Sequence, residues 1–214
     1  MVTEPIPIIG RAWSTALGND IDDVWEALCA NRTGIKECPT TVRLKNNLAA
    51  SIQDLSESPS ERFFQLAKKT LAASIQSIDL SLYKRVALIV GTSFGARLDD
   101  PKAAEGDLDT WGQQLAEAYG IKQVTVLSTA CSSGSDVVYL AGMLIATGEY
   151  DLCICGGVDV LTDAKRLAHT ALGTLSSGEL KPFDKARTGT VLGEGAGFLV
   201  LAKENFNQQD IFAY

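Results

Sequence analysis

The chain has 214 residues, of which 46% are hydrophobic and 21% are charged, and its formal net charge is −7. This composition is typical of a folded globular protein, and the length suffices for one substantial domain. The negative charge argues against nucleic acid as a partner and against membrane binding by charge alone. The longest apolar runs are too short to span a bilayer, and no basic stretch precedes the first apolar residues. We therefore expect a cytoplasmic protein without a membrane segment.

The first half of the chain alternates between strand and helix patterns. An opening strand is expected over 5–15, followed by a helix over 20–34 that Asp20 or Asp22 would cap. Residues 41–52 fit either a strand or an ordered loop. Apolar residues at helical spacing predict a helix over 58–78 with one buried face. A strand over 85–91 and a short helix ending at Gly120 follow.

The second half predicts a strand, a turn, a helix over Ser132–Thr147 and another strand after Gly148. Both strands are apolar throughout, which predicts a parallel pair buried on both faces. A further short helix over 164–173 precedes a glycine-rich turn and a last strand over Phe198–Ala202. The alternation indicates an α/β fold in layers, with a mixed sheet that contains parallel strands.

Five cysteines and one histidine restrict the metal and disulfide chemistry of the chain. The cysteines do not form paired CxxC motifs, so we expect neither a zinc site nor a disulfide framework. Cys153 and Cys155 stand two apart in an apolar run, which favours buried packing. His169 is expected to be locally bonded or solvent-facing, because nothing near it in the sequence would orient it as a base.

Cys131 lies between a strand pattern and a helix pattern, in the sequence TACSSGS. At a helix start, unpaired N–H groups and the helix dipole stabilise a thiolate, which is the nucleophilic form of cysteine. The same amides can face an oxyanion. From position alone, a cysteine at a strand end is more often packed in the interior, and the nucleophile is the alternative.

The glycines of GTVLGEGAGF, residues 189–198, do not form a nucleotide-binding motif, because they precede a strand and are spaced GxGxG. They indicate positive φ angles or a close approach of another segment. Glu194 stands among them and needs a charged partner if it is buried, for which Arg187 and Lys185 are the candidates. Phe183 and Asp184 follow a proline, which is typical of a turn.

Three segments together resemble the β-ketoacyl synthases, the condensing enzymes of fatty acid and polyketide assembly. They are TACSSGSDVVYLAGMLIATGEYDLCICGGVD, KPFDKARTGTVLGEGAGFLVL and the opening IIGRAWSTALGND…VWEALCANRTGI. The resemblance implies a thiolase-like fold and an amino-terminal synthase domain over 1–214. It also implies that Cys131 matches the acyl-accepting nucleophile, without a cofactor or metal. An acyl carrier protein would deliver the acyl group as a phosphopantetheine thioester, which a malonyl thioester would then extend by Claisen condensation.

The resemblance further implies a homo- or heterodimer, with the strand over Val124–Ser128 near the two-fold axis. The loop around Phe183 and Asp184 would frame the acyl pocket. Family synthases are about twice as long, and their two catalytic histidines and lysine belong to a second half that these residues do not match. The glycine–phenylalanine loop of the family's oxyanion hole is also unmatched. Condensation is therefore expected only if a second half supplies the histidines, and without that half an apolar surface would be exposed.

Three alternatives stay open beside the half-synthase. The chain can be a subunit like a chain-length factor that pairs with a complete synthase, although such subunits generally lack the cysteine. It can be a transacylase that uses Cys131 alone, or another enzyme of the thiolase fold. Basic residues on the helix over 58–78 are candidates for docking an acidic carrier protein, or simply form its solvated face; they are Arg62, Lys68 and Lys69.

Overall fold

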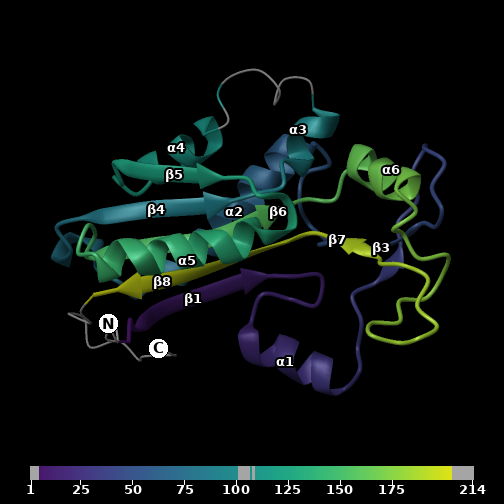
Figure 1. The fold of residues 1–214 in the computed structure, drawn as a ribbon, viewed down its shortest axis with the longest axis horizontal. Coiled ribbons are helices and arrows are strands. Elements are labelled where there is room, and N and C mark those ends of the chain that lie inside the picture. The colour runs from purple at the N-terminus through teal and green to yellow at the C-terminus, as the bar shows by residue number, and fades with distance from the viewer. Residues whose placement is uncertain (1–4, 101–106, 108, 204–214) are drawn as a thin grey trace.

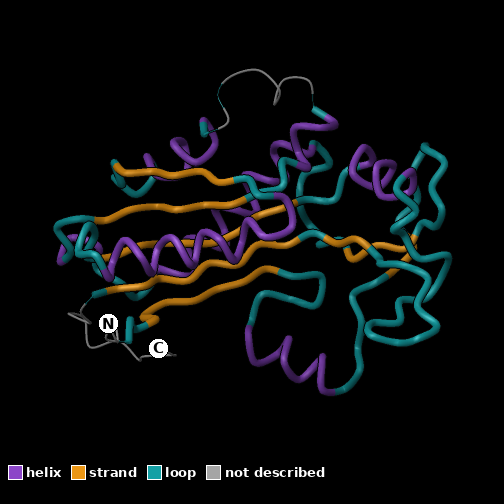
Figure 2. The backbone as a smooth tube through the Cα atoms, in the orientation of Figure 1, coloured by secondary structure: helices purple, strands orange, loops and turns teal. Residues whose placement is uncertain are grey.

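A computed structural model describes residues 5–100, 107 and 109–203. Its main sheet has five strands in the order β1-β8-β6-β4-β5, as Figures 1 and 2 show. These strands are β1 (Ile8–Ser14), β4 (Val86–Gly91), β5 (Gln123–Leu127), β6 (Leu152–Asp159) and β8 (Gly195–Ala202). A smaller sheet consists of β2 (Lys36–Glu37), β3 (Leu48–Ala50) and β7 (Leu192–Gly193). The predicted α/β class with a mixed sheet is confirmed.

Six α-helices and two short 3₁₀ turns connect the strands of the described chain. The helices are α1 (Ile21–Cys29), α2 (Pro59–Ile75), α3 (Gly95–Asp99), α4 (Thr110–Glu117), α5 (Ser133–Ala146) and α6 (Asp163–Ala171). The 3₁₀ turns are η1 (Leu80–Leu82) and η2 (Ala130–Ser132). Asp20 caps α1 as predicted, because its Oδ1 accepts hydrogen bonds from the N–H groups of Asp22 and Asp23 at 2.9 and 3.0 Å.

Strands β5 and β6 both run parallel to β4, which lies between them. The prediction that the two strands form a pair is therefore wrong, although their parallel direction is correct. β5 is an edge strand and keeps Gln123 and Thr125 exposed, so it is not buried on both faces. Sequence pattern does not specify this order, because the strand that separates β5 from β6 comes from an earlier part of the chain.

The two faces of the sheet bury separate apolar clusters. On one face α2 and α4 cover Leu88 and Val90 of β4, and on the other α5 covers Ala87 and Ile89. This alternation follows from the two-residue period of a strand. The α5 cluster also contains the buried Cys153 and Cys155, which confirms the packing predicted for these two cysteines.

Candidate active site

Three parallel strands end at the same edge of the sheet, and the segments that follow them meet there. Thr92 follows β4, the turn with Cys131 follows β5, and Asp159 ends β6. The backbone N–H of Thr92 donates to the carbonyl of Leu127 at 3.2 Å, which continues the β4–β5 pairing beyond the strands. The carboxyl edge of parallel strands is where ligand sites of α/β proteins usually form. We take this edge as the candidate active site.

Cys131 lies in η2, between the end of β5 and the start of α5, and its side chain is exposed. The residue before it, Ala130, has a φ of 56°, in the left-handed region that alanine rarely adopts. Helix α5 begins at Ser133 and ends at Ala146, one residue inside each predicted boundary. The thiol therefore lies at the predicted junction and is open to solvent, and the alternative of a buried sulfur is wrong for this cysteine.

The Ser133 hydroxyl holds the turn around Cys131 together. It accepts a hydrogen bond from the backbone N–H of Thr129 at 3.0 Å and donates to the carbonyl of Ala130 at 2.8 Å. It also reaches the carbonyl of Thr92 at 3.3 Å, in the turn after β4. Ser133 itself is buried, with 4% of its surface exposed. The first residue of α5 thus links the backbone just before Cys131 to the turn after β4.

Asp136, in the first turn of α5, accepts hydrogen bonds from two hydroxyl groups of the turn around Cys131. The hydroxyl of Ser132 donates to Oδ2 of Asp136 at 2.8 Å, and the hydroxyl of Thr129 donates to the same oxygen. These hydroxyl groups, that of Thr129 first, hold the pKa of Asp136 below its ordinary value. The resulting negative charge is favourable at a helix N-terminus.

The start of α5 lies directly on the sheet, and Gly91 is the glycine that this approach requires. A Cβ atom on Gly91 would lie 2.7 Å from the backbone oxygen of Ser133. A Cβ atom on Gly157 would lie 3.4 Å from the Cα of Gly134, in ordinary contact. Close approach here sets the height of the Cys131 turn above the ends of β4 and β6.

Asp159 is a site residue that the sequence analysis did not identify. Its Oδ2 accepts a hydrogen bond from the backbone N–H of Ser93 at 2.8 Å. Its Oδ1 lies 2.9 Å from Nζ of Lys165 and accepts from the Thr92 hydroxyl at 3.4 Å. An acidic residue at the carboxyl end of an apolar parallel strand was the signal in the sequence, because such positions meet at one edge of a sheet.

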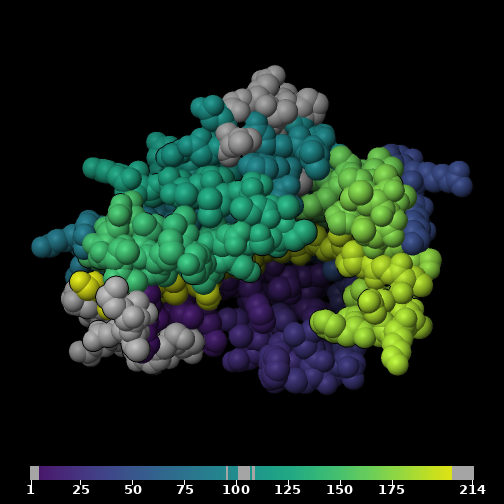
Figure 3. Space-filling view, viewed as in Figure 1, coloured from purple at the N-terminus to yellow at the C-terminus, as the bar shows by residue number. Residues whose placement is uncertain are grey.

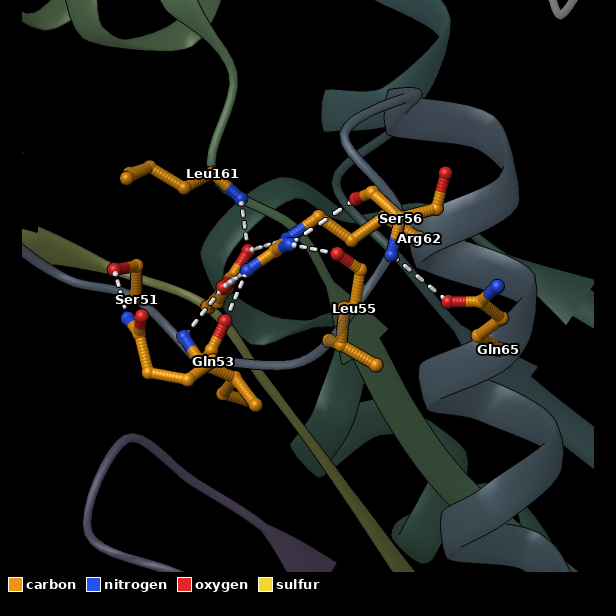
Figure 4. A network of polar contacts seen from close by, with 9 residues as sticks. Ser51, Gln53, Leu55, Ser56, Arg62, Gln65 and Leu161 are labelled. Carbon is orange, nitrogen blue, oxygen red and sulfur yellow. Dashed lines mark hydrogen bonds and ion pairs between the residues drawn. The ribbon is translucent and has the colours of Figure 1, made fainter.

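Glu194 is buried and pairs with Arg62 rather than with Arg187 or Lys185, so the partners predicted for it are wrong. Nε of Arg62 donates to Oε2 at 2.8 Å, and a second guanidinium nitrogen bonds Oε1. The same carboxylate accepts from the N–H groups of Ile52 at 2.6 Å and Leu161 at 3.1 Å (Figure 4). The hydrogen bond to Glu194 raises the pKa of Arg62. Arg187 instead bonds the Asp184 carbonyl of its own loop.

His169 and the loop after α6 have local partners. Nδ1 of His169 lies 2.8 Å from the hydroxyl of Thr174, which confirms the expectation of a locally bonded histidine. The Asp184 carboxylate accepts from the N–H of Ala186 at 2.6 Å, as expected for a turn. Phe183 at its centre is fully exposed and has a φ of 59°. In the same loop Gly189 has a φ of 144°, and a Cβ there would meet backbone atoms at 2.5 Å, as its sequence context predicted.

The sequence of the chain matches a known protein family. Residues 3–94 and 114–207 match the family described as "Beta-ketoacyl synthase, N-terminal domain". The chain is a member of the β-ketoacyl synthases. The resemblance read from the three sequence segments is therefore confirmed.

Relatives of this synthase domain include enzymes of both fatty acid and polyketide assembly. It is 26% identical to the non-reducing polyketide synthase pkdA of Emericella nidulans, over 94% of the chain and 10% of that protein. It is 24% identical to the 3-oxoacyl-[acyl-carrier-protein] synthase 2 of Vibrio harveyi, over 92% of the chain and 57% of that protein. The chain thus spans little more than half of the Vibrio enzyme.

Solved structures show the same fold. A β-ketoacyl synthase from Burkholderia phymatum STM815 matches with a TM-score of 0.75 and 24% identity, over 93% of this chain and 59% of that one. The ishigamide ketosynthase/chain length factor matches with a TM-score of 0.81 and 23% identity, over 92% and 58%. A third, AntDE:AntF, holds a type II acyl-carrier protein with its ketosynthase and has a TM-score of 0.74, at 21% identity and over 92% and 57%. The predicted thiolase-like fold is thereby confirmed.

An apolar groove of about 540 Å³ runs beside α5 in the synthase domain. It lies between Val138 of α5 and Ile21 of α1, with Gly157 and Gly197 on its floor, and Figure 3 shows the hollow between the two helices. On α5 itself Tyr139 and Met143 are exposed, at 70% and 44%. The described chain therefore has an uncovered apolar surface on the α5 side of the sheet.

The described residues show neither a membrane-spanning helix nor a metal-binding cluster. No described helix combines the length and apolar character needed to cross a bilayer. Within the same residues, histidine, cysteine and acidic side chains do not gather in groups of three that could hold a metal ion.

Proposed function

We propose that Cys131 is the acyl-accepting nucleophile of this synthase domain. The observation that carries the proposal is an exposed thiol on a strained turn between a parallel strand and the start of α5. Around it stand small residues, which leave room for a pantetheine arm: Ala130, Ser132 and Gly134. The first N–H groups of a helix have no partner within the helix and can face an oxyanion beside such a sulfur.

The proposed step transfers an acyl group from the phosphopantetheine thiol of an acyl carrier protein. The Cys131 thiolate attacks the thioester carbonyl and forms a tetrahedral oxyanion, which collapses as the carrier thiolate leaves and takes up a proton. The acyl group is then bound to Cys131. Family membership supports this chemistry, and one structural neighbour is a ketosynthase solved with its acyl-carrier protein.

Condensation with a malonyl thioester would follow acyl transfer. The developing enolate needs hydrogen-bond donors, and the only histidine in the 214 residues is engaged with Thr174. We propose that a second half, outside these residues, supplies the histidines. The apolar groove beside α5 supports this, because it leaves a surface that another protein layer can cover.

The acyl carrier protein and a second synthase chain are the proposed partners. Lys68 and Lys69 are exposed on α2 and are available to an acidic carrier, whereas Arg62 is committed to Glu194 and is not. Among the described residues no strand pairs with the outer side of β5, which supports a homo- or heterodimer formed along it. Sedimentation velocity over a range of protein concentrations tests the dimer, and a monomer at all concentrations contradicts it.

Mass spectrometry tests the acyl transfer. The domain is incubated with an acyl-carrier thioester, or with the inhibitor cerulenin, and the adduct is located by peptide mapping. We expect one adduct on Cys131, its loss in Cys131→Ala and its retention in Cys29→Ala, which removes another exposed thiol. Absence of an adduct together with tight binding to a full-length synthase favours a chain-length-factor-like subunit, for which the ishigamide neighbour supplies a matching fold.

A further inference from the structure

Asp159 connects the three segments that meet at the carboxyl edge of the sheet. It is the last residue of β6. Its carboxylate accepts hydrogen bonds from Ser93 and Thr92 in the turn after β4 and pairs with Lys165 at the start of α6. Its side chain is 30% exposed and that of Lys165 is 19% exposed, so the pair lies at the surface of the site without being freely solvated.

The turn after β4 depends on side-chain bonds for its shape. Phe94 has a φ of 59°, and its backbone N–H donates to the Thr92 hydroxyl at 3.1 Å. Asp159 adds a charge-assisted bond from the preceding N–H, that of Ser93, at 2.8 Å. A left-handed aromatic residue persists only where its surroundings enforce it, and the bond to Asp159 fixes the peptide between Thr92 and Ser93.

The same turn presents a backbone acceptor to the turn with the nucleophile. The Ser133 hydroxyl shares its proton between the carbonyls of Ala130 at 2.8 Å and Thr92 at 3.3 Å, and it accepts from the N–H of Thr129. A continuous series of hydrogen bonds thus runs from Asp159 through the β4 turn to the backbone beside Cys131. Two left-handed residues, Ala130 and Phe94, lie on the two turns that it joins.

We propose that Asp159 is a positioning residue for acyl transfer, which holds the Cys131 turn through Thr92 and Ser133. This rests on the proposed function of Cys131. Attack on a thioester requires the sulfur and the oxyanion donors in one fixed geometry, and misplacement by about 1 Å can cost roughly 100-fold in rate. Alkylation by a small reagent needs only an accessible thiol. Loss of Asp159 therefore lowers acylation much more than alkylation.

The test compares variants of the whole chain in three measurements. Acylation of Cys131 by an acyl-carrier thioester and its alkylation by iodoacetamide are followed by mass spectrometry, and amide hydrogen exchange is followed in residues 128–134. We expect Asp159→Ala to lower the acylation rate about 10-fold or more, to change alkylation far less, and to speed exchange at the Thr129 amide. Asp159→Asn keeps an oxygen for the Ser93 N–H and should recover part of the acylation rate.

Two controls and a double-mutant cycle show whether the effect passes through Ser133. Lys165→Met leaves the bond from Ser93 to Asp159 intact. Asp163→Ala removes a nearby acid, on α6, that bonds Thr40 and Arg166 instead. Both should acylate close to the wild-type rate. The losses caused by Asp159→Ala and Ser133→Ala should be less than additive, because each breaks the same connection.

Additive losses, or wild-type exchange at residues 128–134 in Asp159→Ala, would overturn the proposal. Equal losses of acylation and alkylation with a lowered melting temperature would also overturn it, since they indicate general destabilisation. If the wild-type thiol takes up no acyl group, the proposed function fails instead. The exchange measurement then still decides whether Asp159 holds the turn.

Discussion

Arg62 and Glu194 form an ion pair that joins positions 132 residues apart, with the Glu194 side chain completely buried and that of Arg62 15% exposed. The carboxylate also accepts hydrogen bonds from the backbone N–H groups of Ile52, in the loop after β3, and Leu161, in the loop after β6. Glu194 thus connects α2 and the loop after β6 to the start of β8. The loop after β6 directly follows Asp159, so the ion pair also supports the candidate site.

Removal of Glu194 should strongly destabilise the domain. Glu194→Ala leaves a largely buried guanidinium and two backbone N–H groups without their acceptor, and we expect a loss of about 3 kcal/mol in the free energy of unfolding. Denaturant titration measures this loss. Glu61→Ala is the control, because Glu61 on the same helix makes an exposed bond to Ser56 and should cost little. Equal stability of the two variants would show that the ion pair is not a structural anchor.

The five cysteines should fall into distinct classes of reactivity. Cys29 and Cys131 are exposed, Cys38 is partly exposed, and Cys153 and Cys155 are fully buried. Burial raises the pKa of Cys153 to about 12 and, together with the neighbouring Cys153, that of Cys155 to about 12. At pH 8 only about 10⁻⁴ of such a thiol is ionised.

Peptide mapping after iodoacetamide treatment checks this order. We expect early labels on Cys29 and Cys131, a later one on Cys38, and labels on Cys153 and Cys155 only in denaturant. Early labelling of either β6 cysteine in the folded domain would contradict the buried packing against α5.

Local features of the domain were predictable from the sequence, whereas its long-range contacts were not. The Asp20 cap and the position of Cys131 between strand and helix follow from patterns within a few residues. The insertion of β4 between β5 and β6 depends on which strands pair, and single-strand patterns carry no such information. The partner of Glu194 lies 132 residues away on α2, and Asp159 contacts the turn after β4. Both contacts depend on how distant elements pack, so neither was predictable.

Stability at low pH should depend on Asp151 at the opposite edge of the sheet. Arg85 donates to both oxygens of Asp151, and these bonds hold the pKa of Asp151 below its ordinary 3.8. The folded domain therefore binds fewer protons here than the unfolded chain. The stabilisation is complete above pH 3.8 and is lost as pH falls through the folded pKa. Asp151→Asn should flatten the fall of the unfolding free energy below about pH 4 relative to the wild-type domain. Matching acid profiles in the wild type and the variant would rule out this contribution.

Gly91→Ala should displace the turn that carries Cys131. The added Cβ would lie 2.7 Å from the backbone oxygen of Ser133, which cannot move without α5, so we expect a loss of about 1–3 kcal/mol in unfolding free energy. Acylation of Cys131 should fall beyond what the loss of stability explains, because the start of α5 sets the height of the turn. Gly142→Ala is the matched control, since a Cβ at position 142 meets nothing within 4 Å. Alanine is also more stable than glycine in the middle of a helix. Denaturant titration and the acyl-carrier assay measure both effects. If Gly91→Ala acylates as fast as Gly142→Ala, the approach of α5 to β4 does not position the thiol.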